Sequence, residues 1–153
     1  MKTIKVLVTA VCFFALQTAG AQDGLKIGTY GNGDKMIYIS LGNLLKIAQM
    51  TNVEFERNME TYNYKYTEGY GYLWQGGGLM AGYYSISKDP GFAGMIWTEK
   101  NIMVAELKDE LEQYFKGYSG DKYLYEIQTS GSTYQIILRT KDDGSGSVSI
   151  KRF

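Results

Sequence analysis

The sequence predicts a single α+β domain in which a mostly antiparallel β-sheet carries its helices on one face. Three observations predict it. Apolar residues recur at helical spacing in two regions, tyrosines alternate with the period of two that is typical of strands, and short glycine-containing turns separate the later strands. Strands joined by such turns pair antiparallel, and runs of strands beside helices favour α+β over strict β–α alternation. A chain of 153 residues suits one hydrophobic core.

The N-terminus has the three-part pattern of a secretory signal peptide. A basic start (residues 1–5) precedes an apolar run over residues 6–16, and Ala19 and Ala21 supply small side chains ahead of Gln22. The apolar run is much shorter than the roughly 20 residues that a transmembrane helix needs. We therefore expect residues 1–21 to be removed after export to the periplasm or beyond, and we expect no membrane span in the mature chain.

The composition excludes several function classes. The chain has no histidine, which removes Ser-His-Asp and Cys-His nucleophiles and all His-ligated metal sites. Without the signal peptide, 14 basic and 16 acidic side chains remain, and this balance argues against a nucleic-acid partner. Cys12 lies in the signal peptide, so the mature chain would contain no disulfide. We expect no cofactor and no metal.

The first part of the mature chain predicts a lead-in, a short strand and two helices. Glycines interrupt residues 22–34, which we expect to be a loose lead-in to a domain over residues 35–153. A strand is expected over residues 35–39. A helix follows Ser40, its predicted cap, and Thr51 with Glu54 matches the capping box of a second helix that ends near residue 60.

The middle and the end of the chain predict strands around one long helix. Tyrosines alternate over residues 62–66 and 70–72, a glycine loop occupies residues 76–78, and further strands are expected over residues 79–87 and 92–97. The long helix is expected from Asn101 to Lys116. The last strands are expected over residues 122–129, 133–140 and 147–153. A faint echo between residues 55–72 and 111–125 is too weak to predict a repeat.

The long helix is predicted by a stripe of apolar residues four apart, with Gly117 as its terminator. The stripe consists of Met103, Leu107, Leu111 and Phe115. Lys108 and four carboxylates occupy the rest of its surface, and we expect the carboxylates to serve solvation alone: Glu106, Asp109, Glu110 and Glu112.

An excess of aromatic residues in the middle of the chain is the strongest functional signal. Seven of the 14 tyrosines and one of the two tryptophans lie between Tyr62 and Tyr84. Such rings suit sugar stacking or the anchoring of a protein partner, although they also pack well in sheets. We therefore predict a small, non-catalytic binding module whose partner outside the cytoplasm is a protein or a glycan. The candidate binding residues are Tyr70, Tyr72, Trp74 and Tyr83.

Two alternatives remain open at this point. The first is a carboxylate-based, glycosidase-like hydrolase, for which Glu68 and Glu126 are the acids to suspect because they lie in or near the tyrosine-rich strands. The second is an inhibitor or immunity protein that binds a toxin. A glycine match to the dinucleotide fingerprint at residues 76–81 lacks the required helix, and the acidic turns at residues 32–34 and 142–146 lack the ligand spacing of a calcium loop.

Overall fold

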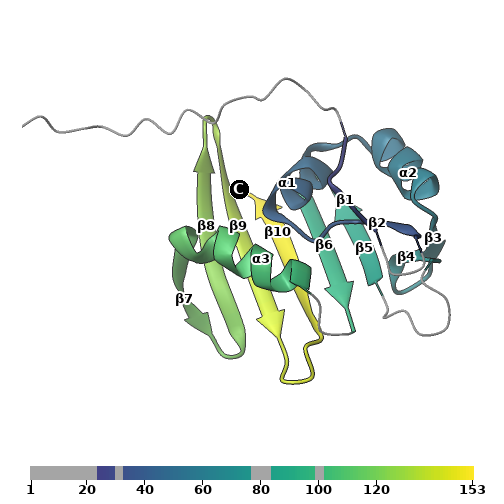
Figure 1. Ribbon diagram of the computed structural model, residues 1–153. Helices are drawn as coiled ribbons and strands as arrows, with labels where there is room; N and C mark the ends of the chain where they lie inside the picture. The colour runs from purple at the N-terminus through teal and green to yellow at the C-terminus, as the bar shows by residue number, and fades with distance from the viewer. Residues whose placement is uncertain (1–23, 30–32, 77–83, 99–101) are drawn as a thin grey trace, which may run out of the picture.

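The chain folds into an eight-stranded antiparallel sheet with α-helices on one face, as the sequence predicts (Figure 1). The structure is a computed structural model that describes residues 24–29, 33–76, 84–98 and 102–153. The expected signal peptide and Tyr83 lie outside these residues. In the described part of the chain, no helix is long and apolar enough to cross a membrane.

The elements follow one another as β1 (Ile27–Thr29), β2 (Lys35–Ile37), α1 (Leu41–Gln49), α2 (Asn52–Thr61), β3 (Tyr64–Thr67), β4 (Gly71–Trp74), β5 (Tyr84–Asp89), β6 (Phe92–Trp97), α3 (Ile102–Leu111), a 3₁₀ turn (Glu112–Tyr114), β7 (Phe115–Ser119), β8 (Lys122–Thr129), β9 (Ser132–Thr140) and β10 (Gly146–Arg152). Strands β1 and β2 form a separate two-stranded sheet.

The two N-terminal helices begin where their caps predict. The Ser40 hydroxyl accepts a hydrogen bond from the Asn43 amide at 3.3 Å and starts α1. At α2 the capping box is complete, because the Thr51 amide donates to the Glu54 carboxylate at 2.8 Å and the Glu54 amide donates to the Thr51 hydroxyl at 3.2 Å. These bonds satisfy amides that have no partner within the helix.

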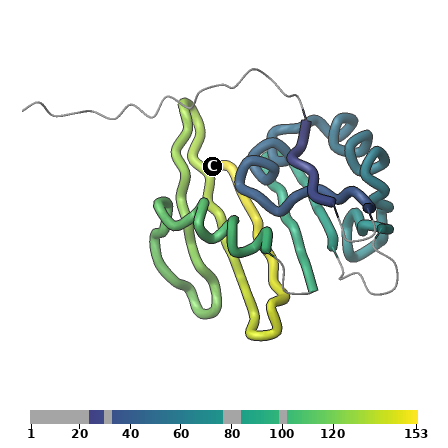
Figure 2. The backbone as a smooth tube through the Cα atoms, viewed as in Figure 1, coloured from purple at the N-terminus to yellow at the C-terminus, as the bar shows by residue number. Residues whose placement is uncertain are grey.

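The large sheet consists of two four-stranded halves. Its strand order is β3-β4-β5-β6-β10-β9-β8-β7, so each half is an antiparallel meander that follows a helical segment in the chain. The last strands of the halves, β6 and β10, pair antiparallel in the centre of the sheet. In Figure 2 the first half runs from blue to teal and the second from green to yellow. This topology relates the halves by an approximate twofold axis between β6 and β10.

The core lies between the helices and the sheet face that they cover. The largest fully buried side chains come from the helices and the strands of both halves. They are Ile37, Leu44, Ile47, Met59, Met95, Trp97, Leu107, Leu111, Ile136, Leu138, Val148 and Ile150. This shared core makes the two halves one domain, since neither half buries its apolar face alone.

The third helix is shorter than the sequence predicts. It ends at Leu111, and Phe115 begins strand β7 instead of continuing the apolar stripe. Gly117 lies inside β7, beside a bulge, and does not terminate the helix. Pairing between Phe115 and Tyr125 of β8 explains the difference, because a long-range strand partner outweighs helical spacing in the local sequence.

The segment expected to be a loose lead-in is packed against the domain. Strand β1 pairs with β2, and the Leu25 side chain is buried. The buried side chain of Asn43 accepts a hydrogen bond from the Lys26 amide at 2.8 Å and donates one to the Lys26 carbonyl at 2.7 Å. The first turn of α1 thereby holds the described part of the lead-in in place.

Candidate functional site

Trp74 is a core residue. Only 8% of its surface is exposed, its indole packs edge-on against Tyr84 at 5.9 Å between ring centroids, and its Nε1 donates to the Lys35 carbonyl at 3.0 Å. A buried indole whose N–H is hydrogen-bonded fits a structural role. The expectation that Trp74 lies on a binding face is therefore wrong.

The other described candidates from the tyrosine-rich region lie at one edge of the sheet. Tyr70 is exposed in the turn between β3 and β4. Tyr72 is half-buried between Phe55 of α2, at 5.2 Å, and Tyr66 of β3, at 5.6 Å. Burial raises the pKa of Tyr72, and the nearby carboxylates of α2 add to the effect. This edge thus combines partly buried and exposed rings.

The two suspected catalytic acids lie far apart. Glu68 belongs to the exposed turn between β3 and β4, whereas Glu126 lies in β8, at least five strand spacings away across the sheet. Five spacings amount to about 24 Å, compared with roughly 5 to 9.5 Å between the carboxyl groups of a glycosidase. Glu126 instead forms an ion pair with Lys116 at 4.0 Å. The structure does not support a hydrolase built on this pair.

A second aromatic cluster, which the sequence analysis missed, lies at the opposite edge of the sheet. It consists of Phe115 and Tyr118 from β7 and Tyr123 and Tyr125 from β8. Ring centroids are 4.9 Å apart between Phe115 and Tyr118, 5.8 Å between Phe115 and Tyr125, and 5.1 Å between Tyr118 and Tyr123. Tyr118 is 68% exposed and Phe115 is 42% exposed, so much of this aromatic surface faces solvent.

This cluster forms one wall of a hollow of about 360 Å³, and α3 with the 3₁₀ turn forms the other. The second wall contributes Lys108, Asp109 and Glu112. We call this hollow the α3 groove. It combines apolar ring faces with charged groups of both signs, which is a composition suited to ligand recognition.

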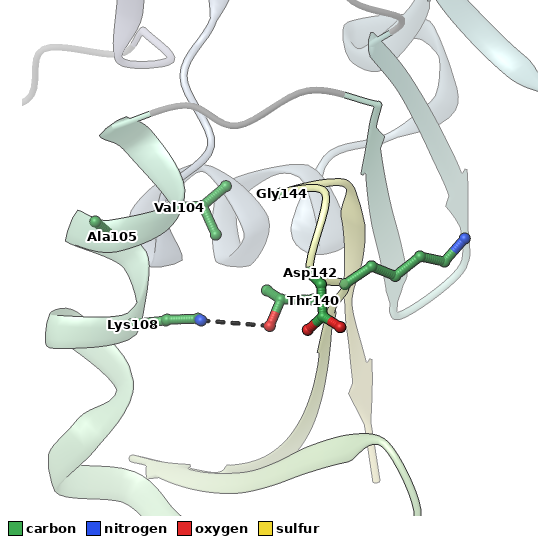
Figure 3. Close-up of a pocket in the computed structure, with 7 residues that line it drawn as sticks. Val104, Ala105, Lys108, Thr140, Asp142 and Gly144 are labelled. Carbon is green, nitrogen blue, oxygen red and sulfur yellow. Dashed lines mark hydrogen bonds between the residues drawn. The ribbon is translucent and has the colours of Figure 1, made fainter.

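Lys108 lines both the α3 groove and a second hollow of about 270 Å³, which is shown in Figure 3. Its ammonium donates to the Thr140 hydroxyl at 3.3 Å and lies 5.8 Å from the centre of the Tyr123 ring. The second hollow is otherwise lined by α3 and by the β9–β10 turn, from which Asp142 faces Lys108 in Figure 3. Lys108 therefore lies between an aromatic side and a polar side.

Two carboxylates of α3 do more than solvate the helix. Glu106 accepts a hydrogen bond from the Tyr38 hydroxyl at 2.7 Å, and Glu110 accepts one from the Leu41 amide at 2.9 Å. The bond to Glu106, together with burial and the charges of Glu106 and Glu110, raises the pKa of Tyr38 to about 12. Lys26 completes the cluster with an ion pair to Glu106 at 3.6 Å. These contacts fasten α3 to the start of α1.

The described residues contain no group of three or more metal-ligating His, Cys, Asp or Glu side chains. In the acidic turn after β9, the Asp143 carboxylate accepts a hydrogen bond from the Ser145 amide at 2.8 Å, and hydrogen bonds to Ser145 lower the Asp143 pKa. A local side-chain turn thus accounts for Asp143.

Comparison with protein-family models, curated proteins and solved structures found no match to this chain. The α3 groove is the candidate site on the strength of its geometry alone: four clustered rings, three charged side chains and an open hollow between a helix and the edge of the sheet.

Proposed function

We propose that this protein is an exported, non-catalytic binding module that holds a protein partner in the α3 groove. One observation carries the proposal: the exposed rings of Phe115 and Tyr118 line a hollow whose opposite wall is charged. Tyrosine is enriched among the residues that dominate binding energy at protein interfaces, where rings are surrounded by polar rims.

The exposure of Tyr118 supports binding over packing. With about two-thirds of its surface in solvent, the ring contributes little to the core, and its contacts are with the neighbouring rings of Phe115 and Tyr123. A partner that covered these rings would bury apolar surface at roughly 25 cal/mol per Å². Binding of a partner in the α3 groove would therefore be favoured by burial of these rings.

Export is part of the proposal and is supported by the three-part N-terminal pattern. A partner outside the cytoplasm follows from it. A glycan is the competing ligand, since aromatic rings also stack on sugars.

The experiment compares binding by the mature protein with binding by two variants. Tyr118→Ala removes a ring of the α3 groove, and Phe153→Ala is the matched control because it removes a similarly exposed ring at the C-terminus. Partners captured from envelope extract are identified by mass spectrometry, purified and titrated against all three proteins. We expect Tyr118→Ala to weaken binding at least tenfold and Phe153→Ala to leave it unchanged.

Equal binding by all three proteins would remove the α3 groove from consideration. A glycan array run in parallel covers the competing ligand, and a sugar whose binding is lost in Tyr118→Ala would replace the protein partner.

A further inference from the structure

One row of side chains crosses all eight strands on the helix-covered face, and the same residue types occupy its two ends. Cross-strand partners follow one another from edge to edge of the sheet. The row is Tyr66, Tyr72, Ile86, Met95, Val148, Leu138, Tyr123 and Tyr118. Under the approximate twofold axis, Tyr66 corresponds to Tyr118 and Tyr72 to Tyr123, so a tyrosine pair ends the row at each edge.

The two tyrosine pairs have the same geometry. Tyr66 and Tyr72 meet edge-on with centroids 5.6 Å apart and planes at 65°, and Tyr118 and Tyr123 meet at 5.1 Å and 63°. The outermost rings are equally exposed, at 67% for Tyr66 and 68% for Tyr118. The faint echo between residues 55–72 and 111–125 therefore covers segments with equivalent places in the two halves, each running from a helix into tyrosine-containing edge strands.

The helical segment beside each pair carries two carboxylates on or near the side that faces the rings. Asp109 and Glu112 line the α3 groove together with Tyr118 and Tyr123. At the other edge, α2 packs its Phe55 on Tyr72, and the charges of Glu56 and Glu60 act on the Tyr72 hydroxyl. Aromatic faces beside carboxylates attract cations by ring quadrupole and by charge.

We propose that the sheet carries two equivalent tyrosine–carboxylate sites, one at each edge, and that each takes a basic side chain of the protein partner. The inference rests on the proposed function and extends it, because it names the partner's chemistry and adds a second site. The first site, Tyr66 and Tyr72 with Glu56 and Glu60, we call the α2 site. The second is the α3 groove.

Charge complementarity selects a basic occupant. Carboxylates outnumber cations beside the two tyrosine pairs, with Glu56, Glu60, Asp109 and Glu112 against Lys108, and the mature chain carries a net charge of −2. Lys108 places its ammonium 5.8 Å from the centre of the Tyr123 ring, near the outer limit for a cation–π contact, so this ring already receives a cation of its own chain. A guanidinium from the partner would bind closer to the ring and to Asp109.

The distance between the sites sets the reach of the partner. Tyr66 and Tyr118 lie on the two edge strands, seven strand spacings apart, which is about 34 Å along the sheet. One partner that engages both sites must present basic side chains at this separation. Its affinity would then exceed that of either site alone, because the second contact forms within the complex.

The test is an NMR titration of the mature protein with ¹³C-labelled tyrosine rings. One titrant is a short oligo-arginine peptide, and the other is its citrulline counterpart, which has the same shape without the charge. We expect the arginine peptide to change the ring chemical shifts of both tyrosine pairs in a saturable way, and we expect the citrulline peptide to cause no change. Tyr118→Leu should weaken arginine binding at the α3 groove by roughly 3- to 30-fold and leave the α2 site intact, and Tyr66→Leu should do the reverse.

Lys108→Met sharpens the test. Removal of the resident cation should strengthen arginine binding at the α3 groove by up to about fivefold. Weaker arginine binding in this variant would overturn the proposal, because it would mean that the charges of the groove do not select a basic ligand.

Shifts at one pair alone would overturn the equivalence of the sites, and equal responses to arginine and citrulline, or no response to either, would overturn a basic ligand. If Tyr118→Ala abolishes partner binding while oligo-arginine does not bind, the proposed function stands and this inference falls.

Discussion

Replacing Leu111 by alanine tests whether α3 is held by its apolar side. The Leu111 side chain has no exposed surface and belongs to the core between helices and sheet. Truncation of a buried leucine costs about 2 to 5 kcal/mol, through lost burial and the cavity that remains. For a domain of this size, about 3 kcal/mol lowers the melting temperature by about 10 °C. Urea unfolding followed by tryptophan fluorescence measures it, since Trp74 and Trp97 are both buried.

Glu110→Ala is the comparison on the same helix. The sequence alone predicts almost no effect, but the Glu110 carboxylate accepts the Leu41 amide at 2.9 Å, so we expect a loss of about 0.5 to 1.5 kcal/mol. Glu112→Ala, at an exposed position, should change stability by less than about 0.5 kcal/mol. If Leu111→Ala were no more damaging than Glu110→Ala, the assignment of Leu111 to the core would be refuted.

Three further predictions concern other parts of the chain. The contact with Glu106 helps to raise the Tyr38 pKa to about 12. The stability that this contact provides should therefore be complete below pH 10 and lost as the pH rises toward 12. In measurements of melting temperature against pH, Tyr38→Phe should flatten the curve in this range. Thr51→Ala should cost about 1 kcal/mol in urea unfolding, because the amide of Glu54 loses its cap. The intact mass of the exported protein should correspond to a chain that begins at Gln22, and a full-length mass in a cytoplasmic fraction would contradict export.

Elements with local signals could be predicted from the sequence. Ser40 and the Thr51–Glu54 capping box mark the starts of α1 and α2 because a cap is decided by residues within one turn. The strand over residues 92–97 is predicted with its bounds, since a turn with proline and glycine precedes it. Period-two tyrosines likewise indicate β3 and β4. In each case the deciding information lies within a few residues.

Elements that depend on distant partners could not be predicted. Phe115 continues a helical stripe in the sequence, but it pairs with Tyr125 across a bulge and starts an edge strand. The short strand β1 exists because it pairs with β2 and because Asn43 holds the Lys26 backbone from α1. Local spacing carries no information about either partner.

The same reason explains the outcome for the candidate site. The tyrosine excess directs attention to residues 62–84, and this region does contribute Tyr72 to an aromatic cluster, whereas Trp74 is in the core. The α3 groove was not predicted because Phe115 reads as part of a helix and because Tyr118, Tyr123 and Tyr125 lie outside the tyrosine excess at residues 62–84. Two tyrosines in the sequence echo, Tyr118 and Tyr123, were the available signal, and their meaning depends on strand pairing.

The row across the sheet contains central positions that the core constrains and outermost positions that it does not. Its four central positions need only apolar volume, and they hold different residues in the two halves: Ile86 corresponds to Leu138, and Met95 to Val148. Packing tolerates such exchanges among side chains of similar size. The outermost positions are mostly in solvent, where packing requires no aromatic ring, and yet both hold tyrosine with the same partner and the same geometry. The two proposed sites would account for equal residues at positions where the core demands least, because a partner that contacts both edges would require both rings.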